Sequence, residues 1–410
     1  MIEVQAGPRA ETPLHYAWRI LAACCALNGA TLGIIINCKG LFFAPVCAEL
    51  GCPVSALTAY TMFYGLSAAV MLLRVDRILA RYPIRWVLTL SLLSLCGATA
   101  AMGAFHRLPL WYAAGTVQGI SGAFLLYIPV PMLINHWFSR RRGFALGVAA
   151  TASGVLGAVM NPVLSTVIGA WGWRTAYVVQ GGVAFVLAAP FTLFVIVRRP
   201  EELGLVPYGR GTAEQRSRPS PVTAGCEGGR KKLLCCMLFA ASFTFCATYA
   251  QHLANFAAAS GWDGHIGAVM VSSCMVGNIC AKAVLGAACD RWGGRRACLA
   301  SLLLVMLGFL LLSGGAPWRG GLFFGAFLIG IDHANMTVLV PIAVGAVSTP
   351  ETFDHRISRV TMSTMLTSAF SATVIAAFYD LLGSYAVVFL LGAVLQVLCM
   401  GLAVVLFQRT

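Results

Sequence analysis

The sequence predicts an all-α polytopic membrane protein, with 12 transmembrane helices in two pseudo-symmetric six-helix halves. A low charged fraction, long apolar runs and an internal repeat lead to this fold class. Asp, Glu, Lys and Arg make up 10% of the 410 residues, against about 25% in an ordinary soluble domain. Hydrophobic residues make up 59%. Because a soluble chain cannot bury that much apolar surface, the composition excludes a soluble enzyme, a disordered protein and a nucleic-acid-binding protein.

The apolar runs account for the helices. Crossing the hydrocarbon core takes about 20 residues, and runs of that length occur twelve times between charged or Pro/Gly breaks. The runs are continuous rather than alternating, which favours helices over membrane strands. They lie near residues 18–44, 54–74, 84–104, 109–135, 143–168, 174–197, 233–259, 264–288, 297–315, 319–345, 357–381 and 384–407.

The longest polar stretch divides the chain. Residues 198–232 carry eight Lys and Arg residues together with several Pro and Gly. We therefore expect an N-terminal six-helix half over 1–197, a cytoplasmic linker over 198–232 and a C-terminal six-helix half over 233–410.

The distribution of Lys and Arg predicts the orientation. Cytoplasmic segments of membrane proteins are enriched in these residues. With both termini inside, only Arg107, Arg174 and Arg319 fall in outer loops, and only Lys39 and Lys282 fall inside predicted spans; the rest of the 28 Lys and Arg are cytoplasmic. This asymmetry predicts an N-in/C-in protein and explains the net charge of +14 without a nucleic-acid partner.

The two halves repeat one another in sequence. Landmark residues recur at an offset of 210 or 211, which indicates duplication, as in transporters whose halves rock around a central site. The recurring pairs are Arg81 and Arg291, Arg85 and Arg295, Gly119 and Gly330, and Gly172 and Gly383.

Two motifs resemble those of the major facilitator superfamily. The run from Gly286 to Arg296, GAACDRWGGRR, is similar to its GxxxDRxGxR loop motif and lies between the eighth and ninth predicted helices. The run from Trp137 to Gly147, WFSRRRGFALG, resembles the helix 4–5 junction of the branch that holds monocarboxylate transporters and oxalate/formate antiporters. The helix 11 Lys of the antiporters has no counterpart in 357–381, which weakens a dicarboxylate assignment.

The resemblance implies the major facilitator fold and a function. We expect a secondary active transporter of a small organic anion, a monocarboxylate first, coupled to protons and working by alternating access. Its partners would be that anion, protons or a counter-anion and the lipid bilayer, in a bacterial inner (plasma) membrane. The alternatives are an organic anion exchanger, a neutral-solute facilitator, or a membrane sensor that does not transport. No nucleophile–base or metal constellation and no phosphate-binding motif is present, so we expect neither an enzyme nor a cofactor.

Lys282 is the leading candidate for binding the anion. An ionisable residue inside a span costs about 2.5–3.5 kcal/mol on insertion scales, so each raises a functional hypothesis. Lys282 lies eight residues before Asp290, about 12 Å inside the cytoplasmic helix end. The segment from Asn278 to Lys282 resembles the place where this branch carries a substrate-binding Arg or Lys. The alternative is a structural ion pair with Asp332.

The tenth predicted helix carries the candidates for proton coupling. Asp332 lies near its middle, and Asn335 shares its face. His333 is rotated by about 100° and cannot line the same surface. Asp332 is therefore a proton or counter-charge site or a hydrogen-bonded packing acid, and His333 is a relay or a satisfied interhelical histidine.

Lys39 lies near the outer end of the first helix. Some monocarboxylate transporters carry a coupling Lys in this helix, although Lys39 is slightly out of register with their pattern. The alternative is a side chain that extends outward to the membrane surface. Further candidates for contacts to substrate are Asn37, Tyr127, Asn255, Asn278 and Asn335.

The loop motif predicts an inner gate. In the resembled family the charged residues of this motif close the inner gate, which implies that role for Asp290, Arg291 and Arg295. The alternative is the ordinary enrichment of cytoplasmic loops in positive charge. The 15 cysteines show no metal-ligand spacing and are interpreted as packing residues. Cys47 and Cys52 fall in an expected outer loop and can pair.

Overall fold

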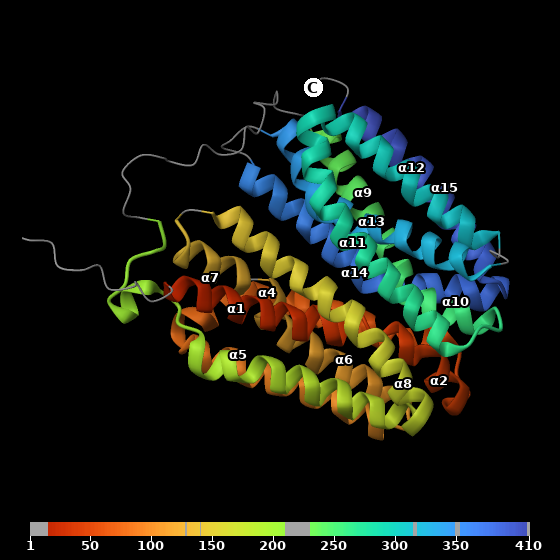
Figure 1. Cartoon of the computed structure of the whole chain (residues 1–410), viewed down its shortest axis with the longest axis horizontal. Coiled ribbons are helices and arrows are strands. Elements are labelled where there is room, and N and C mark those ends of the chain that lie inside the picture. Colours follow the sequence, from red (N-terminus) through yellow and green to blue (C-terminus); the bar gives the residue numbers. More distant parts are fainter. Residues whose placement is uncertain are drawn as a thin grey trace, which may run out of the picture.

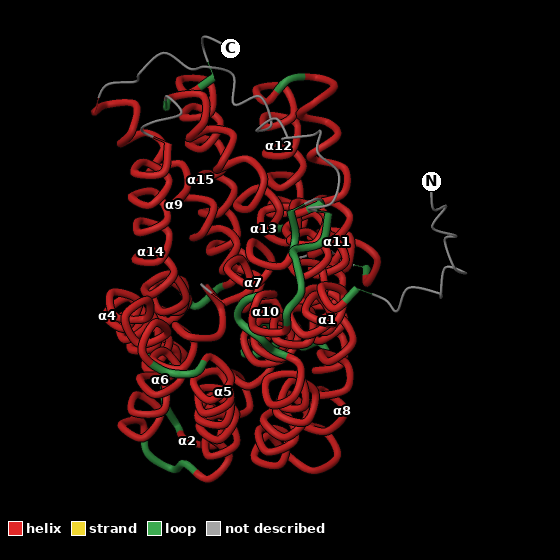
Figure 2. Tube along the Cα trace, turned by 90° about the vertical axis from the view of Figure 1, so that its left-hand side faces the viewer, coloured by secondary structure: helices red, strands yellow, loops and turns green. Residues whose placement is uncertain are grey.

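The computed structural model describes residues 15–127, 129–139, 141–209, 230–314, 318–348 and 353–407, and this part of the chain contains no β-strand (Figure 2). The helices are α1 (Tyr16–Asn28), η1 (Gly29–Ile36), α2 (Gly40–Leu50), α3 (Val54–Thr58), α4 (Tyr60–Arg81), α5 (Ile84–Ala101), η2 (Met102–Ala104), α6 (Leu108–Gly122), η3 (Ala123–Tyr127), α7 (Pro129–Trp137), α8 (Arg142–Pro190), η4 (Phe191–Val195), η5 (Pro200–Leu203), α9 (Arg230–Ala247), η6 (Thr248–His252), α10 (Leu253–Ala259), α11 (Gly264–Trp292), α12 (Gly294–Ser313), α13 (Arg319–Val347), α14 (Phe353–Leu382) and α15 (Tyr385–Leu406).

The helices form eleven candidate membrane spans in the described residues. One of them, Phe144–Val195, is 52 residues long and joins two helices across a break. Gly172 makes this break with φ 79° and ψ 164°, a conformation that glycine adopts without the steric cost of a Cβ. Counted separately, the two helices give the twelve predicted spans, and most of the predicted ends agree to within a few residues.

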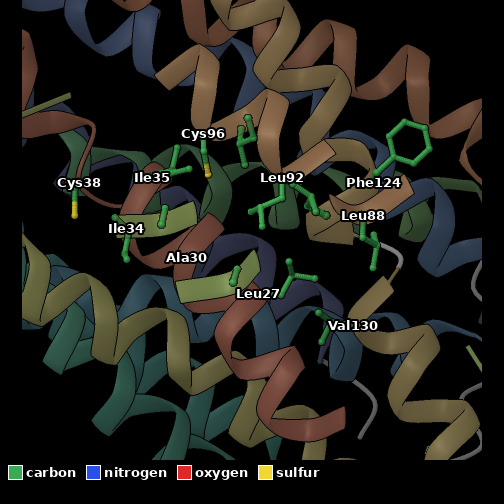
Figure 3. Close-up of a cluster of buried hydrophobic side chains, with 14 of the residues drawn as sticks. Leu27, Ala30, Ile34, Ile35, Cys38, Leu88, Leu92, Cys96, Phe124 and Val130 are labelled. Carbon is green, nitrogen blue, oxygen red and sulfur yellow. The ribbon is translucent and has the colours of Figure 1, made fainter. Parts of the chain in front are cut away.

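The spans pack into two bundles with separate cores (Figure 1). The core of the first bundle lies almost wholly within residues 17–197. Its centre joins α1 and η1 to α5 through side chains such as Leu27, Ile34 and Leu92 (Figure 3). Two clusters within residues 236–407 form the core of the second bundle. In each bundle the apolar helix faces that pack inward position the polar residues described below.

The bundles meet toward one end of the molecule. Figure 1 shows that they converge where α2 and α10 lie and diverge toward the other end. Near the α2 end the backbone N–H of Ser55 donates to Asp380 Oδ2 at 3.0 Å. Between α11 and α8, Ser272 Oγ donates to the carbonyl oxygen of Ala158 at 2.8 Å. These contacts close one end of the interface between the halves.

The first part of the predicted linker is bound to the first bundle. The Tyr208 N–H donates to the Trp137 carbonyl at 2.8 Å, and the Ser139 N–H donates to the Tyr208 carbonyl at 2.9 Å. The Trp137 indole donates to the Val197 carbonyl at 2.9 Å. Residues 197–208 therefore cover the divergent end of the first bundle, and residues 210–229 lie outside the described residues.

Candidate functional site

Two glycines bring α11 and α13 close together. A methyl group at Gly277 would overlap the Phe327 carbonyl oxygen, and one at Gly330 would overlap the Cys274 carbonyl oxygen. Only hydrogen fits at both positions, so the helix backbones are in direct contact. About one helical turn further along each helix this packing brings Lys282 of α11 near His333 of α13.

Lys282 and His333 lie within electrostatic range of one another on this helix pair. Both side chains are half-buried, and the Lys282 ammonium acts electrostatically on the His333 ring. His333 Nδ1 is buried without a hydrogen-bond partner. Lys282 has no carboxylate partner among the described residues. One cation and one imidazole nitrogen without a hydrogen-bond partner therefore lie near one another on α11 and α13.

Asp332 points elsewhere, into the core of the second bundle. Its side chain is 0% exposed. Gln396 Nε2 of α15 donates to Asp332 Oδ2 at 2.8 Å, and Asn335 Nδ2 donates to Oδ1 at 3.2 Å. The predicted shared face of Asp332 and Asn335 is thus observed, and so is the separation of His333 from it. The alternative of an ion pair between Asp332 and Lys282 is wrong, because both carboxylate oxygens are turned toward amides.

Lys39 lies at an irregularity in the first span. The Asn37 N–H donates to the Leu32 carbonyl at 2.9 Å, an i→i+5 bond that ends the π-helix η1. Lys39 then joins η1 to α2. Its ammonium lies 4.4 Å from the ring centroid of Tyr64 and 5.3 Å from that of Tyr60.

This position corrects one expectation. Lys39 is 6% exposed, so its side chain does not extend outward to the membrane surface. The two tyrosine rings of α4 hold the ammonium through cation–π contacts instead. Among the described residues it has no carboxylate partner.

The remaining predicted residues are dispersed. Asn278 and Asn255 are buried, at 5% and 4% exposure, and Asn37 packs against Gly157 of α8. The structure does not bring Asn37 or Asn255 to the pair of Lys282 and His333. Arg291 and Arg295 are exposed at the divergent end. The side chains of Tyr127 and Asp290 lie outside the described residues, and so do the predictions made for them.

Three residues of these environments were not predicted. Gln396 is the one amide in the apolar run from Tyr385 to Leu406, a signal that would have marked it. Tyr60 and Tyr64 are four residues apart and share a helix face, but nothing in the sequence shows that this face meets Lys39. The described residues contain no group of three or more His, Cys, Asp or Glu able to hold a metal ion.

Two bundles of membrane-crossing helices, with isolated cations inside them, define a polytopic membrane protein of the transporter class. The model of the Major Facilitator Superfamily matches residues 20–257 and 233–410, so the chain belongs to that superfamily. The family consists of transporters rather than enzymes, which confirms the predicted fold and class.

The curated relatives include several monocarboxylate transporters. Monocarboxylate transporter 12 of Mus musculus is 32% identical over 135 residues, which is 32% of this chain and 27% of that protein. Monocarboxylate transporter 11 of Mus musculus is 26% identical over 289 residues, which is 67% of this chain and 60% of that protein. The matches therefore span less than two thirds of these relatives.

Solved structures share the fold at low identity. The nucleoside transporter NupG has a TM-score of 0.71 at 12% identity, over 97% of this chain and 100% of that one. A bacterial homologue of the human lysosomal transporter Spinster, in an inward-facing and occupied conformation, has a TM-score of 0.66 at 14% identity, over 96% and 97%.

Proposed function

We propose that the protein is a secondary active transporter of a small organic anion, a monocarboxylate first, and that it works by alternating access. The observation that carries this proposal is the pair of membrane-embedded lysines, Lys39 and Lys282, which lack carboxylate partners among the described residues. A cation in this setting is costly unless an anion compensates it. A carboxylate substrate supplies that charge.

Lys282 holds the carboxylate in this proposal. Its ammonium offers three hydrogen-bond donors without a fixed geometry. His333 lies near Lys282, and its Nδ1 has no hydrogen-bond partner within the protein. In this proposal Nδ1 donates a hydrogen bond to the second carboxylate oxygen of the substrate. Asn278 lies one turn from Lys282 on α11 and supplies a polar group at the same site.

Proton coupling is the second part of the proposal. Lys39 is enclosed by Tyr60 and Tyr64 near the end where the halves meet. A lysine amine that is buried without a carboxylate partner can lose and regain its proton during a transport cycle, which suits a coupling residue. Asp332 remains a second candidate. Because its carboxyl binds Gln396, its protonation would act on helix packing rather than on the anion directly.

The proposed orientation is N-in/C-in in a bacterial inner membrane. The bundles then meet on the outer side and diverge on the cytoplasmic side, an inward-facing arrangement (Figure 1). Rocking of the halves would open the outer contacts and close the inner end, where Asp290, Arg291 and Arg295 would form the gate. The printed names of the monocarboxylate transporter relatives support the substrate class.

An uptake experiment tests the proposal. Purified protein in proteoliposomes is given labelled monocarboxylates, with and without a pH gradient, and with unlabelled anion inside. We expect accumulation driven by an acidic exterior, together with counterflow. Uptake that requires internal anion and ignores the gradient would identify an exchanger. Uptake of neutral solutes alone would identify a facilitator, and binding without translocation a sensor.

A further inference from the structure

The outer turn between α2 and α3 contains a pair of thiols. Cys47 lies in the last turn of α2, and Cys52 follows Gly51, whose φ of 63° turns the chain back on itself. The Cys52 N–H donates to the Cys47 carbonyl at 3.4 Å, and the two Sγ atoms are 3.9 Å apart. The sulfurs are thus ~2 Å further apart than the ~2.05 Å of a disulfide, a gap that rotation of the side chains can close.

We propose that Cys47 and Cys52 form an intramolecular disulfide that restrains the outer contact between the halves. The proposal rests on the orientation given above, which places this turn outside the cell, where disulfides persist. Cys52 is the more exposed of the two thiols. Cys47 lies three residues before the end of the candidate span Tyr16–Leu50, and Cys52 is the one described cysteine outside every candidate span.

The chemistry is thiol–disulfide exchange. The Cys52 thiolate attacks a disulfide of an oxidoreductase or of a small-molecule oxidant and forms a mixed disulfide. The Cys47 thiolate then attacks the Cys52 sulfur and releases the oxidant's second thiol. The two cysteines lose two protons and two electrons, and the oxidant's disulfide becomes two thiols.

Contacts to both bundles hold the segment around this turn, which links its redox state to the outer contact between the halves. Between the two cysteines, Glu49 forms an ion pair with Arg174 at 2.8 Å within the first bundle. After it, the Ser55 N–H donates to Asp380 of the second bundle at 3.0 Å. Because both cysteines belong to one half, the disulfide does not lock the halves together. It limits the freedom of the segment that makes their outer contact.

Differential alkylation tests the bond directly and requires no transport assay. Cells expressing the full chain are denatured in a first maleimide, then reduced and treated with a second maleimide of different mass, and peptides are analysed by mass spectrometry. We expect Cys47 and Cys52 to carry the second label and Cys280 to carry the first. Cys47→Ser should move Cys52 to the first label. First label on both cysteines in the wild-type protein would overturn the proposal.

The restraint is tested on the purified protein with and without reductant. We expect reduction to lower the thermal unfolding midpoint and to change the counterflow rate of the wild type, and to change neither in a Cys47→Ser/Cys52→Ser variant. An oxidised wild type that does not respond to reductant would overturn the restraint. The unfolding midpoint is informative even if no carboxylate is transported, so this result is independent of the proposed function.

Discussion

Asp332 and His333 are consecutive residues of α13, yet their side chains lie in different environments. The Asp332 carboxylate accepts a hydrogen bond from Gln396 at 2.8 Å in the core of the second bundle. The His333 ring lies within the electrostatic reach of Lys282 on the opposite side of the helix contact. The step of about 100° per residue in an α-helix separates the packing environment of Asp332 from the binding role that we propose for His333.

Removing the charge of Lys282 should abolish anion binding. In Lys282→Gln we expect no thermal stabilisation by a carboxylate that stabilises the wild type, where a ligand at 100 times its Kd contributes about 2.7 kcal/mol. Lys282→Arg should retain part of the effect, because the cation is kept. Lys231→Gln, at an exposed lysine, is the control. Wild-type stabilisation of Lys282→Gln would favour a neutral substrate.

Lys39→Met should stabilise the protein while impairing coupling. The substitution removes a buried cation whose insertion costs up to about 2.5–3.5 kcal/mol, and methionine keeps the contact with the tyrosine rings. We expect a higher unfolding midpoint and loss of pH-driven accumulation in proteoliposomes. Arg19→Met, at an exposed position, should change neither. Intact accumulation would exclude Lys39 from coupling.

Asp332→Asn should separate binding from coupling. The side-chain oxygen of asparagine can still accept from Gln396, so the fold and the binding of carboxylate are expected to persist. If Asp332 carries the coupled proton, pH-driven uptake is lost while exchange of bound anion continues. Gln396→Leu is the companion variant, since it removes the partner and leaves the acid. Unchanged pH-driven uptake in Asp332→Asn would leave His333 and Lys39 as the candidates.

Gly330→Ala should destabilise the fold and disturb the anion site together. The added methyl overlaps the Cys274 carbonyl, so α11 and α13 must separate, at about 1–3 kcal/mol. Lys282 and His333 would move apart, and the affinity for carboxylate should fall. Gly286→Ala on α11 has no atom within 4 Å of the new methyl and should stabilise by about 1 kcal/mol. Equal effects of the two variants would contradict this account of the packing.

The linker provides a test of orientation. In a background without reactive native cysteines, Ser220→Cys should resist an impermeant thiol reagent in intact cells, because 198–232 is predicted to be cytoplasmic. Asp263→Cys, in the loop before α11, should react from outside. Labelling of Ser220→Cys with protection of Asp263→Cys would invert the topology.

The sequence predicted most of the fold and only part of the site. Span length is a local property set by bilayer thickness, so the runs appear directly in the sequence. Lys282 is predicted as a site residue because a lone cation in an apolar run is conspicuous. The environment into which the Asp332 side chain points depends on which helices flank α13 and on the contact of Gly330 with α11. Neither of these contacts can be predicted from the local sequence pattern.

The π-helix before Lys39 changes the direction in which this residue points. An i→i+5 turn takes up about one residue more than an α-turn, so every residue after η1 is shifted around the helix axis relative to an unbroken α-helix. A position-by-position alignment of the first span with an unbroken α-helix therefore compares residues that point in different directions. The place of Lys39 in the first span is therefore better defined by its contact with the two tyrosines of α4 than by counting from the start of the helix.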